Sequence, residues 1–328
     1  MDILVVGAGP AGLAAAIAGH RQGLETLVVE KGALVNSIFH FPQGMTFFTT
    51  PDLLEIGGLP FVTPYEKPTR LEALRYYRRV AEVTGLLLSL GERVDAVDHD
   101  GQSFVVRGNT SRMGPGGRTT VRKARNVVFA TGYYDQPNLL GVPGEDLPHV
   151  SHYYDDPHPF HRQDVVVVGA KNSAAIAALE LFRAGARVTL VHRGPSLSDS
   201  IKYWIRPDIE NRIREGNIVA RFEAHVTHIG LSAVTVRGPG GDEELPADAV
   251  LLLTGYRPDV ETLERAGVAI DAVTLAPRHD PLTFETNIPG LFVAGSVVSG
   301  LETGRTFIEN GRHHGEAIVR AILARARA

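Results

Sequence analysis

A glycine-rich turn near the start of the chain has the residue types and spacing that bind a dinucleotide. Gly7, Gly9 and Gly12 follow the apolar run 2–6, and the acidic Glu30 comes 18 residues after Gly12. Glycine here permits a tight strand-to-helix turn and lets the backbone approach a pyrophosphate, which the helix N-terminus binds through free N–H groups. A carboxylate at Glu30 can accept hydrogen bonds from a ribose diol. The turn therefore predicts a dinucleotide site; its N-terminal position suits FAD, although spacing does not separate FAD from NAD.

A second turn of the same kind, at residues 169–174, differs from the first in its chemistry. Lys171 and Ala174 replace the second and third glycines, and His192 with Arg193 stands where the acid was. A carboxylate would repel a 2′-phosphate, whereas an arginine can bind one through two hydrogen bonds. We therefore expect NADPH rather than NADH as the second nucleotide. Two further basic residues, Lys202 and Arg206, are candidates for additional positive charge.

Both turns need a strand before them and a helix after them, and the sequence supplies this arrangement twice. A buried strand, an alanine-rich helix and a second strand are predicted over 2–30, and the same order returns over 164–192. Three glycines keep one offset of 162 residues, beginning with Gly7 and Gly169. A constant offset without gaps indicates an internal repeat, so two nucleotides are expected.

The rest of the chain alternates between helical and strand-like stretches. We expect a helix over 69–84 that begins at the N-cap Thr69 and ends near Gly85. The other predicted elements are antiparallel strands over 93–107 and 119–129 around a turn at 114–117, a proline-rich connector over 133–163, strands over 218–221, 225–229, 233–237 and 249–254, and a last helix from about Thr306 to Arg325.

This layout predicts an α/β fold with two Rossmann-like dinucleotide-binding domains, the second inserted in the first. The first domain is expected over 1–140 and 256–328, and the second over 141–255. Three strand ends, at Thr131–Gly132, Thr254–Gly255 and Gly295–Ser296, place a small residue beside a glycine. Such turns let a cofactor lie close to the backbone.

Composition excludes several classes of protein. The 328 residues contain 33 Lys and Arg against 37 Asp and Glu, a net charge of −4, whereas a nucleic-acid binder should carry a basic excess. No apolar run reaches the roughly 18 residues of a membrane span. The start at Met1–Asp2 has no basic signal segment, so a cytoplasmic location is expected, with neither nucleic acid nor membrane as partner.

The chain has no cysteine. This absence excludes disulfides, thiolate metal sites, a cysteine nucleophile and a Cys-x-x-Cys redox pair. Histidine is the remaining common metal ligand, and His149, His152, His158 and His161 cluster in the expected connector. A proline-rich linker without a poised carboxylate is a poor metal site, so no metal is predicted.

A set of motifs in fixed order covers nearly the whole chain and resembles the low-molecular-weight flavoprotein reductases of the thioredoxin reductase plan, most closely the bacillithiol-disulfide reductase family. The motifs are GAGPAG (7–12), VVEKG (28–32), NSIFHFP (36–42), ATGYYDQP (130–137), GAKNSA (169–174), VHRG (191–194), SIKYWIRPDIE (200–210), TGYRPD (254–259) and FIENGR (307–312).

The resemblance implies a homo-oligomeric oxidoreductase with FAD in the first domain and NADPH in the second. Hydride would pass from NADPH to FAD, and electrons then to a low-molecular-weight disulfide or a small redox protein, with no side chain acting as the catalytic nucleophile. The FAD contacts implied by position are Gly7, Gly9, Pro10, Ala11, Gly12, Glu30, Lys31, Asn36, Val94, Thr131, Gly132, Gly295 and Ser296. The NADPH contacts are Gly169, Lys171, Asn172, Ser173, His192, Arg193, Lys202, Thr254 and Gly255.

Three positions depart from the pattern of these families. The Cys-x-x-Cys of thioredoxin reductases is missing, Ala11 replaces a cysteine of the bacillithiol-disulfide reductases, and Ser296 replaces an aspartate. A thiolate relay through the protein is therefore impossible, and the resemblance supports the cofactors better than the electron acceptor. His313 and His314 lie near the predicted last helix. Their residue type fits either a structural role or an approach to the flavin edge.

Three other functions fit a cysteine-free flavoprotein of this kind. A ferredoxin– or flavodoxin–NADP reductase would pass single electrons to an iron–sulfur or flavin partner. A flavin monooxygenase shares the Phe129–Tyr133 stretch and the second glycine-rich turn. A flavin-bound redox sensor would show negligible turnover with NADPH.

Overall fold

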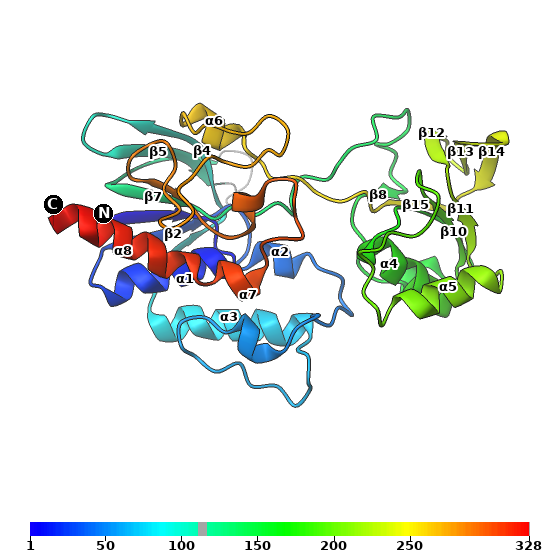
Figure 1. Cartoon of the computed structure of the whole chain (residues 1–328), viewed down its shortest axis with the longest axis horizontal. Helices are drawn as coiled ribbons and strands as arrows, with labels where there is room; N and C mark the ends of the chain where they lie inside the picture. The colour runs from blue at the N-terminus through cyan, green and yellow to red at the C-terminus, as the bar shows by residue number, and fades with distance from the viewer. Residues whose placement is uncertain (111–116, 328) are drawn as a thin grey trace. The chain divides into compact units, whose positions relative to one another are not determined.

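The computed structural model describes residues 1–110 and 117–327, which fold as two compact units (Figure 1). Unit 1 consists of Met1–Gln136 and Tyr256–Ala328, and unit 2 consists of Pro137–Gly255. Most of the turn expected at 114–117 lies outside the described residues. No helix within the described ranges is both long enough and apolar enough to cross a membrane.

Unit 1 is built on a five-stranded parallel sheet of order β16-β7-β1-β2-β3. Its alternate side chains face two different cores. Ile3 and Val5 pack towards the helices, while Leu4 and Val6 pack towards an antiparallel sheet. Because both of its faces are covered, the central strand is a continuous buried apolar run, ILVV over residues 3–6. The strands are β1 (Ile3–Val6), β2 (Thr26–Glu30), β3 (Leu87–Leu90), β7 (Asn126–Phe129) and β16 (Leu291–Val293).

Two long helices lie side by side on one face of this sheet (Figure 1). They are α1 (Pro10–Arg21) and α8 (His314–Arg327), and a Cβ on Gly315 would come within 2.4 Å of the Ala15 Cα. Glycine is therefore required for this close helix packing. The other helices of unit 1 are α2 (Asn36–Phe39), η1 (Pro51–Leu54), α3 (Arg70–Thr84), α6 (Glu261–Arg265), η3 (Gly295–Ser299) and α7 (Ile308–Gly311).

The expected helix over 69–84 is confirmed as α3. Thr69 and Glu72 form a reciprocal capping box, and Gly85 ends the helix in the left-handed conformation. The prediction of a single last helix from about Thr306 was wrong, because the helix is interrupted between α7 and α8. Arg312 lies at the break, and its guanidinium donates to the carbonyl oxygens of Asp52 and Glu55. This contact with a distant loop overrides the local helical pattern.

The run 93–107, expected as one strand, is two strands. Asp100 turns the chain, because its carboxylate accepts the backbone N–H groups of Gln102 and Ser103. The result is a three-stranded antiparallel sheet on the opposite side of the parallel sheet from α1 and α8 (Figure 1). Its strands are β4 (Glu92–His99), β5 (Phe104–Thr110) and β6 (Arg118–Ala124).

Unit 2 repeats this architecture. Its parallel sheet has the order β8-β15-β9-β10-β11, each strand matching one in unit 1, and an antiparallel sheet again precedes the strand next to the first one. The helices after the first strands, α1 and α4, begin at Pro10 and Asn172, which keeps the 162-residue offset. The elements are β8 (Val150–Ser151), η2 (His158–Phe160), β9 (Asp164–Val168), α4 (Asn172–Arg183), β10 (Arg187–Val191), α5 (Arg206–Arg214), β11 (Val219–Arg221), β12 (His225–Ile229), β13 (Ala233–Gly238), β14 (Gly241–Pro246) and β15 (Ala249–Leu252).

Two features of unit 2 differ from expectation. Residues 137–163, expected as a connector, are part of the unit: β8 pairs with β15, and Leu140 and Leu147 pack on its core. The strand β14 was not expected, since its first four residues are all exposed and it lacks alternating apolar residues. Its pairing with β13 stabilises it instead.

A buried carboxylate joins β4 to β6 in unit 1. Glu92 is 2% exposed and accepts hydrogen bonds from Thr120 at 2.6 Å and from Arg122 at 2.7 and 2.9 Å. Burial opposes ionisation, but the hydrogen bonds from Arg122, Ser89 and Thr120 outweigh it and lower the pKa of Glu92 to about 2. The carboxylate therefore stays ionised at neutral pH.

We expect Glu92→Gln to lower the free energy of unfolding by about 3 kcal/mol at pH 7, because it leaves Arg122 without its buried partner. A carboxyl with a lowered pKa stabilises the fold above its ordinary value of 4.5 and loses this effect as the pH falls towards 2. The difference between wild type and variant should shrink over that range, as measured by chemical denaturation.

Asp98→Asn is the matched control on the same strand. Asp98 pairs with Arg107, but both side chains are about half exposed, so its loss should cost less than about 0.5 kcal/mol. Equal effects of the two substitutions would contradict the assignment of Glu92.

Candidate functional site

The first glycine-rich turn links the end of β1 to the start of α1. A Cβ on Gly12 would lie 2.0 Å from the Gly7 carbonyl oxygen, so glycine is required for the helix to pack on the turn. A Cβ on Gly9, by contrast, would meet nothing within 4 Å. Gly9 thus borders open space at the N-terminus of α1, which begins with Pro10 and has no side-chain cap. This is the arrangement that a pyrophosphate group requires.

The carboxylate of Glu30 ends β2 beside this turn. It is 7% exposed, and its two oxygens accept the backbone N–H groups of Ala8 at 2.9 Å and Gly32 at 2.8 Å. Burial raises the pKa of Glu30, partly offset by these two hydrogen bonds. The carboxylate therefore holds the loop in place, and each oxygen retains a lone pair for a ribose hydroxyl.

Two polar residues near Glu30 have partners that sequence reasoning missed. Lys31 forms an ion pair with Asp135 at 2.8 Å, so Asp135 belongs to this edge of the sheet. The sequence feature that could have identified Asp135 is its place in the ATGYYDQP motif. Asn36 accepts the backbone N–H of Ala33 at 3.1 Å, which closes the loop after Glu30.

The ends of β7 and β16 lie next to the first turn. A Cβ on Gly295 would come within 2.7 Å of the Ala11 Cβ, and a Cβ on Gly132 within 3.6 Å of the Ser296 hydroxyl. These contacts bring all three predicted segments of unit 1 to one edge of the sheet, as the parallel strands require. Val94 is a partly buried residue of β4 that packs against the apolar core, and the residue before β4, Gly91, donates its N–H to the Gly32 carbonyl in the loop after Glu30.

The hydroxyl of Thr131 indicates whether a cofactor fits this edge of the sheet. Its oxygen is buried and makes no hydrogen bond to any residue in the described ranges. A buried hydroxyl without a partner is costly, and a polar ligand would satisfy it. Together with the open space beside Gly9, it fits a bound dinucleotide.

The second glycine-rich turn is stabilised by hydrogen bonds to residues 200–202. The Asn172 side chain donates to the Ser200 carbonyl at 3.1 Å and accepts the Lys202 N–H at 2.9 Å. Its amide therefore positions Lys202 beside the start of α4, where Gly169, the exposed Lys171 and the exposed Ser173 also lie. At the end of β15, Thr254 donates to the Asn138 carbonyl at 2.7 Å, next to Gly255.

The basic residues predicted to bind the second nucleotide differ in whether their side chains already bond to other residues of the chain. Arg193 is exposed and makes no hydrogen bond or ion pair within residues 1–110 and 117–327. Burial, with the neighbouring Arg193 charge, lowers the pKa of His192, so this ring is neutral at pH 7. Arg206, expected as a further charge for the nucleotide, donates instead to Ser198, Asp199 and Glu210. Arg193 is thus the available guanidinium at this end.

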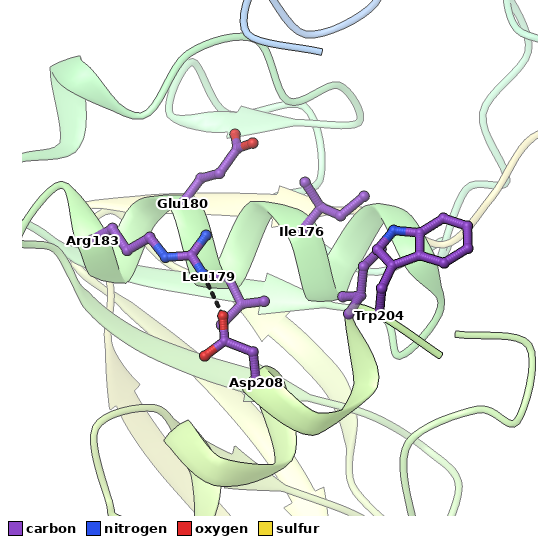
Figure 2. Close-up of a pocket in the computed structure, with 7 residues that line it drawn as sticks. Ile176, Leu179, Glu180, Arg183, Trp204 and Asp208 are labelled. Atoms are coloured by element: carbon purple, nitrogen blue, oxygen red, sulfur yellow. Dashed lines mark hydrogen bonds and ion pairs between the residues drawn. The ribbon is translucent and has the colours of Figure 1, made fainter. Parts of the chain in front are cut away.

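A cavity of about 230 Å³ lies between α4 and α5 of unit 2 (Figure 2). Its apolar wall includes Trp204, and an ion pair between Arg183 and Asp208 borders it. The α4 residues that line it begin at Ile176, beyond the glycine-rich turn. None of the predicted NADPH contacts lines the cavity.

Three of the four histidines of 137–163 have side chains that contact other residues of the chain. His149 lies 3.1 Å from the Gly230 carbonyl oxygen, His161 lies 2.7 Å from that of Ala184, and His152 is 3.5 Å from Glu145. Across the part of the chain that the structure describes, no three His, Asp or Glu side chains gather as metal ligands do.

The chain has two parallel sheets of the same strand arrangement, each with a glycine-rich turn at one edge. This arrangement defines the class of oxidoreductases that bind two dinucleotides. The chain belongs to the pyridine nucleotide-disulphide oxidoreductase family, whose model matches residues 4–295. It is thus an oxidoreductase, and membership implies FAD and NAD(P)H as cofactors.

Individual relatives confirm the resemblance seen in the motifs. The chain is 43% identical to the bacilliredoxin reductase Bdr of Bacillus subtilis (strain 168), over 98% of this chain and 97% of the relative. The structure of the bacillithiol disulfide reductase Bdr from Bacillus cereus superposes with a TM-score of 0.96 at 42% identity and 99% coverage of both chains. A thioredoxin reductase from T. acidophilum shares the fold, with a TM-score of 0.76 at 20% identity over 100% of this chain and 99% of that one.

Proposed function

We propose that this chain is an FAD-dependent reductase that uses NADPH to reduce a low-molecular-weight disulfide of the bacillithiol disulfide type. The relatives named for bacillithiol disulfide and bacilliredoxin support the substrate class. The observation that carries the proposal is the chemical difference between two turns of one architecture, Glu30 at the first and Arg193 at the second. By resemblance we also propose a cytoplasmic homo-oligomer.

In unit 1, the FAD would be held at the edge formed by the ends of β1, β7 and β16. The N–H groups at the start of α1 bind the pyrophosphate across Gly9, Glu30 accepts from the ribose, and the Thr131 hydroxyl hydrogen-bonds the cofactor. The other proposed contacts are Gly7, Pro10, Ala11, Gly12, Lys31, Asn36, Gly132, Gly295 and Ser296. Val94 of β4 is proposed as a further FAD contact, by its position in the resemblance.

In unit 2, the NADPH would be held at the second turn. Arg193 binds the 2′-phosphate, the start of α4 binds the pyrophosphate, and Asn172 keeps Lys202 beside it. The neutral His192 adds no charge at this end. The remaining proposed contacts are Gly169, Lys171, Ser173, Thr254 and Gly255.

The reaction transfers two electrons and breaks one S–S bond. NADPH, one proton and the disulfide give NADP⁺ and two thiols, and FAD, when bound, supplies the two-electron carrier between them. The chain contributes no thiolate, since it has no cysteine and Ala11 stands in the first turn. Its residues bind and orient the reactants, and the protein does not form a mixed disulfide.

Anaerobic stopped-flow spectroscopy tests this function. The yellow protein should be bleached by NADPH and rapidly reoxidised by bacillithiol disulfide, with two thiols formed per NADPH. Ferredoxin and a quinone serve as alternative acceptors. Fast reoxidation by ferredoxin with none by the disulfide would assign a ferredoxin–NADP reductase instead, and a colourless protein that does not take up FAD would overturn the proposal.

A further inference from the structure

The turn after β16 depends on a side chain from a distant part of unit 1. Gly295 is buried, adopts φ +73°, and donates its backbone N–H to Nδ1 of His314 at 3.2 Å. The preceding residue, Ala294, still pairs with the Phe129 carbonyl at 2.8 Å. A buried N–H needs a partner, and the strand pairing stops one residue too early to supply it. The imidazole of His314 fills this place.

The ring of His314 is in turn fixed by Phe284. The two rings stack with centroids 4.0 Å apart and an interplanar angle of 16°. Phe284 adopts φ +60°, and its carbonyl accepts the Val293 N–H of β16 at 3.0 Å. A left-handed backbone is strained for an aromatic residue and persists only where its surroundings hold it. This backbone conformation lets the phenyl ring stack on His314 while the Phe284 carbonyl stays paired with β16.

The charge state of His314 agrees with this geometry. Because Gly295 donates, Nδ1 must be an unprotonated acceptor, and the ring proton lies on Nε2. Burial, helped by the neighbouring His279 and His313, lowers the pKa of His314 to about 4. Its position at the N-terminus of α8 also disfavours a positive charge. The acceptor is therefore available throughout the neutral range.

We infer that His314 is a positioning residue for the cofactor edge of unit 1: its neutral imidazole holds the Gly295 peptide in place, and Phe284 holds the imidazole. This inference rests on the proposed function, which places FAD beside Gly295 and Ser296. His314 then acts on the cofactor through the backbone. Without its acceptor, the Gly295 N–H turns towards another partner, and the loop no longer fits the cofactor.

Two substitutions separate the hydrogen bond from the stacking. His314→Phe keeps an aromatic ring against Phe284 but removes the acceptor, and it should weaken FAD binding about tenfold. His314→Asn removes the ring but places an amide oxygen near Nδ1, and it should bind FAD within about threefold of wild type. His20→Phe is the control at an exposed histidine at the end of α1 and should bind FAD as wild type does.

The measurements are the FAD dissociation constant of the apoprotein, the visible spectrum and midpoint potential of the bound flavin, and the melting temperature of the apoprotein. His314→Phe should shift the spectrum and potential, and His314→Asn should restore them. Wild-type binding and spectrum in His314→Phe would overturn the inference. So would equal FAD loss in both His314 variants, which would assign the role to ring packing. If wild type itself does not bind FAD, the proposed function fails before any variant is compared.

Discussion

Replacing Gly9 by valine should weaken FAD binding on the order of 100-fold while leaving the apoprotein as stable as wild type. The reason is geometric. A Cβ on Gly9 meets no protein atom within 4 Å, so the folded chain has room for it. Its φ of −72° and ψ of 172° are extended backbone that valine readily adopts. The added side chain fills the space proposed for the pyrophosphate. FAD titration of the apoprotein and thermal melting measure the two effects separately.

Two other glycines provide the controls. Gly12→Ala should destabilise the apoprotein itself, because its Cβ would lie 2.0 Å from the Gly7 carbonyl oxygen. Gly44→Val lies in an exposed loop with open space around the new Cβ, and should change neither stability nor FAD affinity. Wild-type FAD affinity in Gly9→Val would show that the pyrophosphate does not bind at this turn.

Arg193→Ala should weaken NADPH binding by about 10- to 100-fold and leave NADH binding unchanged. A guanidinium that hydrogen-bonds a phosphate contributes about 1.5–3 kcal/mol, and NADH has no 2′-phosphate to bind. In the structure this guanidinium has no hydrogen bond or ion pair with a described residue, so its removal disturbs no internal contact. The dissociation constants of both nucleotides and the rate of flavin reduction by each are the quantities to compare.

Arg237→Ala is the matched control, since Arg237 is an exposed arginine of the same unit that pairs with Asp242 in a hairpin. It should bind both nucleotides as wild type does. An equal loss of NADPH and NADH binding in Arg193→Ala would assign the arginine to the shared part of the nucleotide and remove the stated basis for an NADPH preference.

Local chemistry explains which features were predictable. The Thr69–Glu72 capping box, the strand before Gly7 and the turn after it involve residues only a few positions apart, so their types and spacing determine them. The repeat was visible because three glycines, beginning with Gly7 and Gly169, recur at one offset although the other two glycines of the first turn are replaced in the second. The fold class followed, since two strand-turn-helix units of this kind require parallel sheets.

Features that depend on distant residues were not predictable in the same way. The strand β8 comes from the stretch expected as a connector, and β14 exists because β13 pairs with it. Arg206 and Arg193 are both basic residues near the second turn in the sequence. Only the folded chain shows that the acceptors Ser198, Asp199 and Glu210 engage the first and leave the second available.

The sequence by itself predicted two nucleotide sites, located their turns, placed an acid at one and an arginine at the other, and excluded a protein thiol. The tertiary structure decided how those turns are supported: by Glu30 accepting from Ala8 and Gly32, by Asn172 holding Lys202, and by His314 accepting from Gly295. A motif encodes backbone conformation within a few residues. A hydrogen bond between residues far apart in the chain requires the packed core that brings them together, and that core forms only when the whole unit folds.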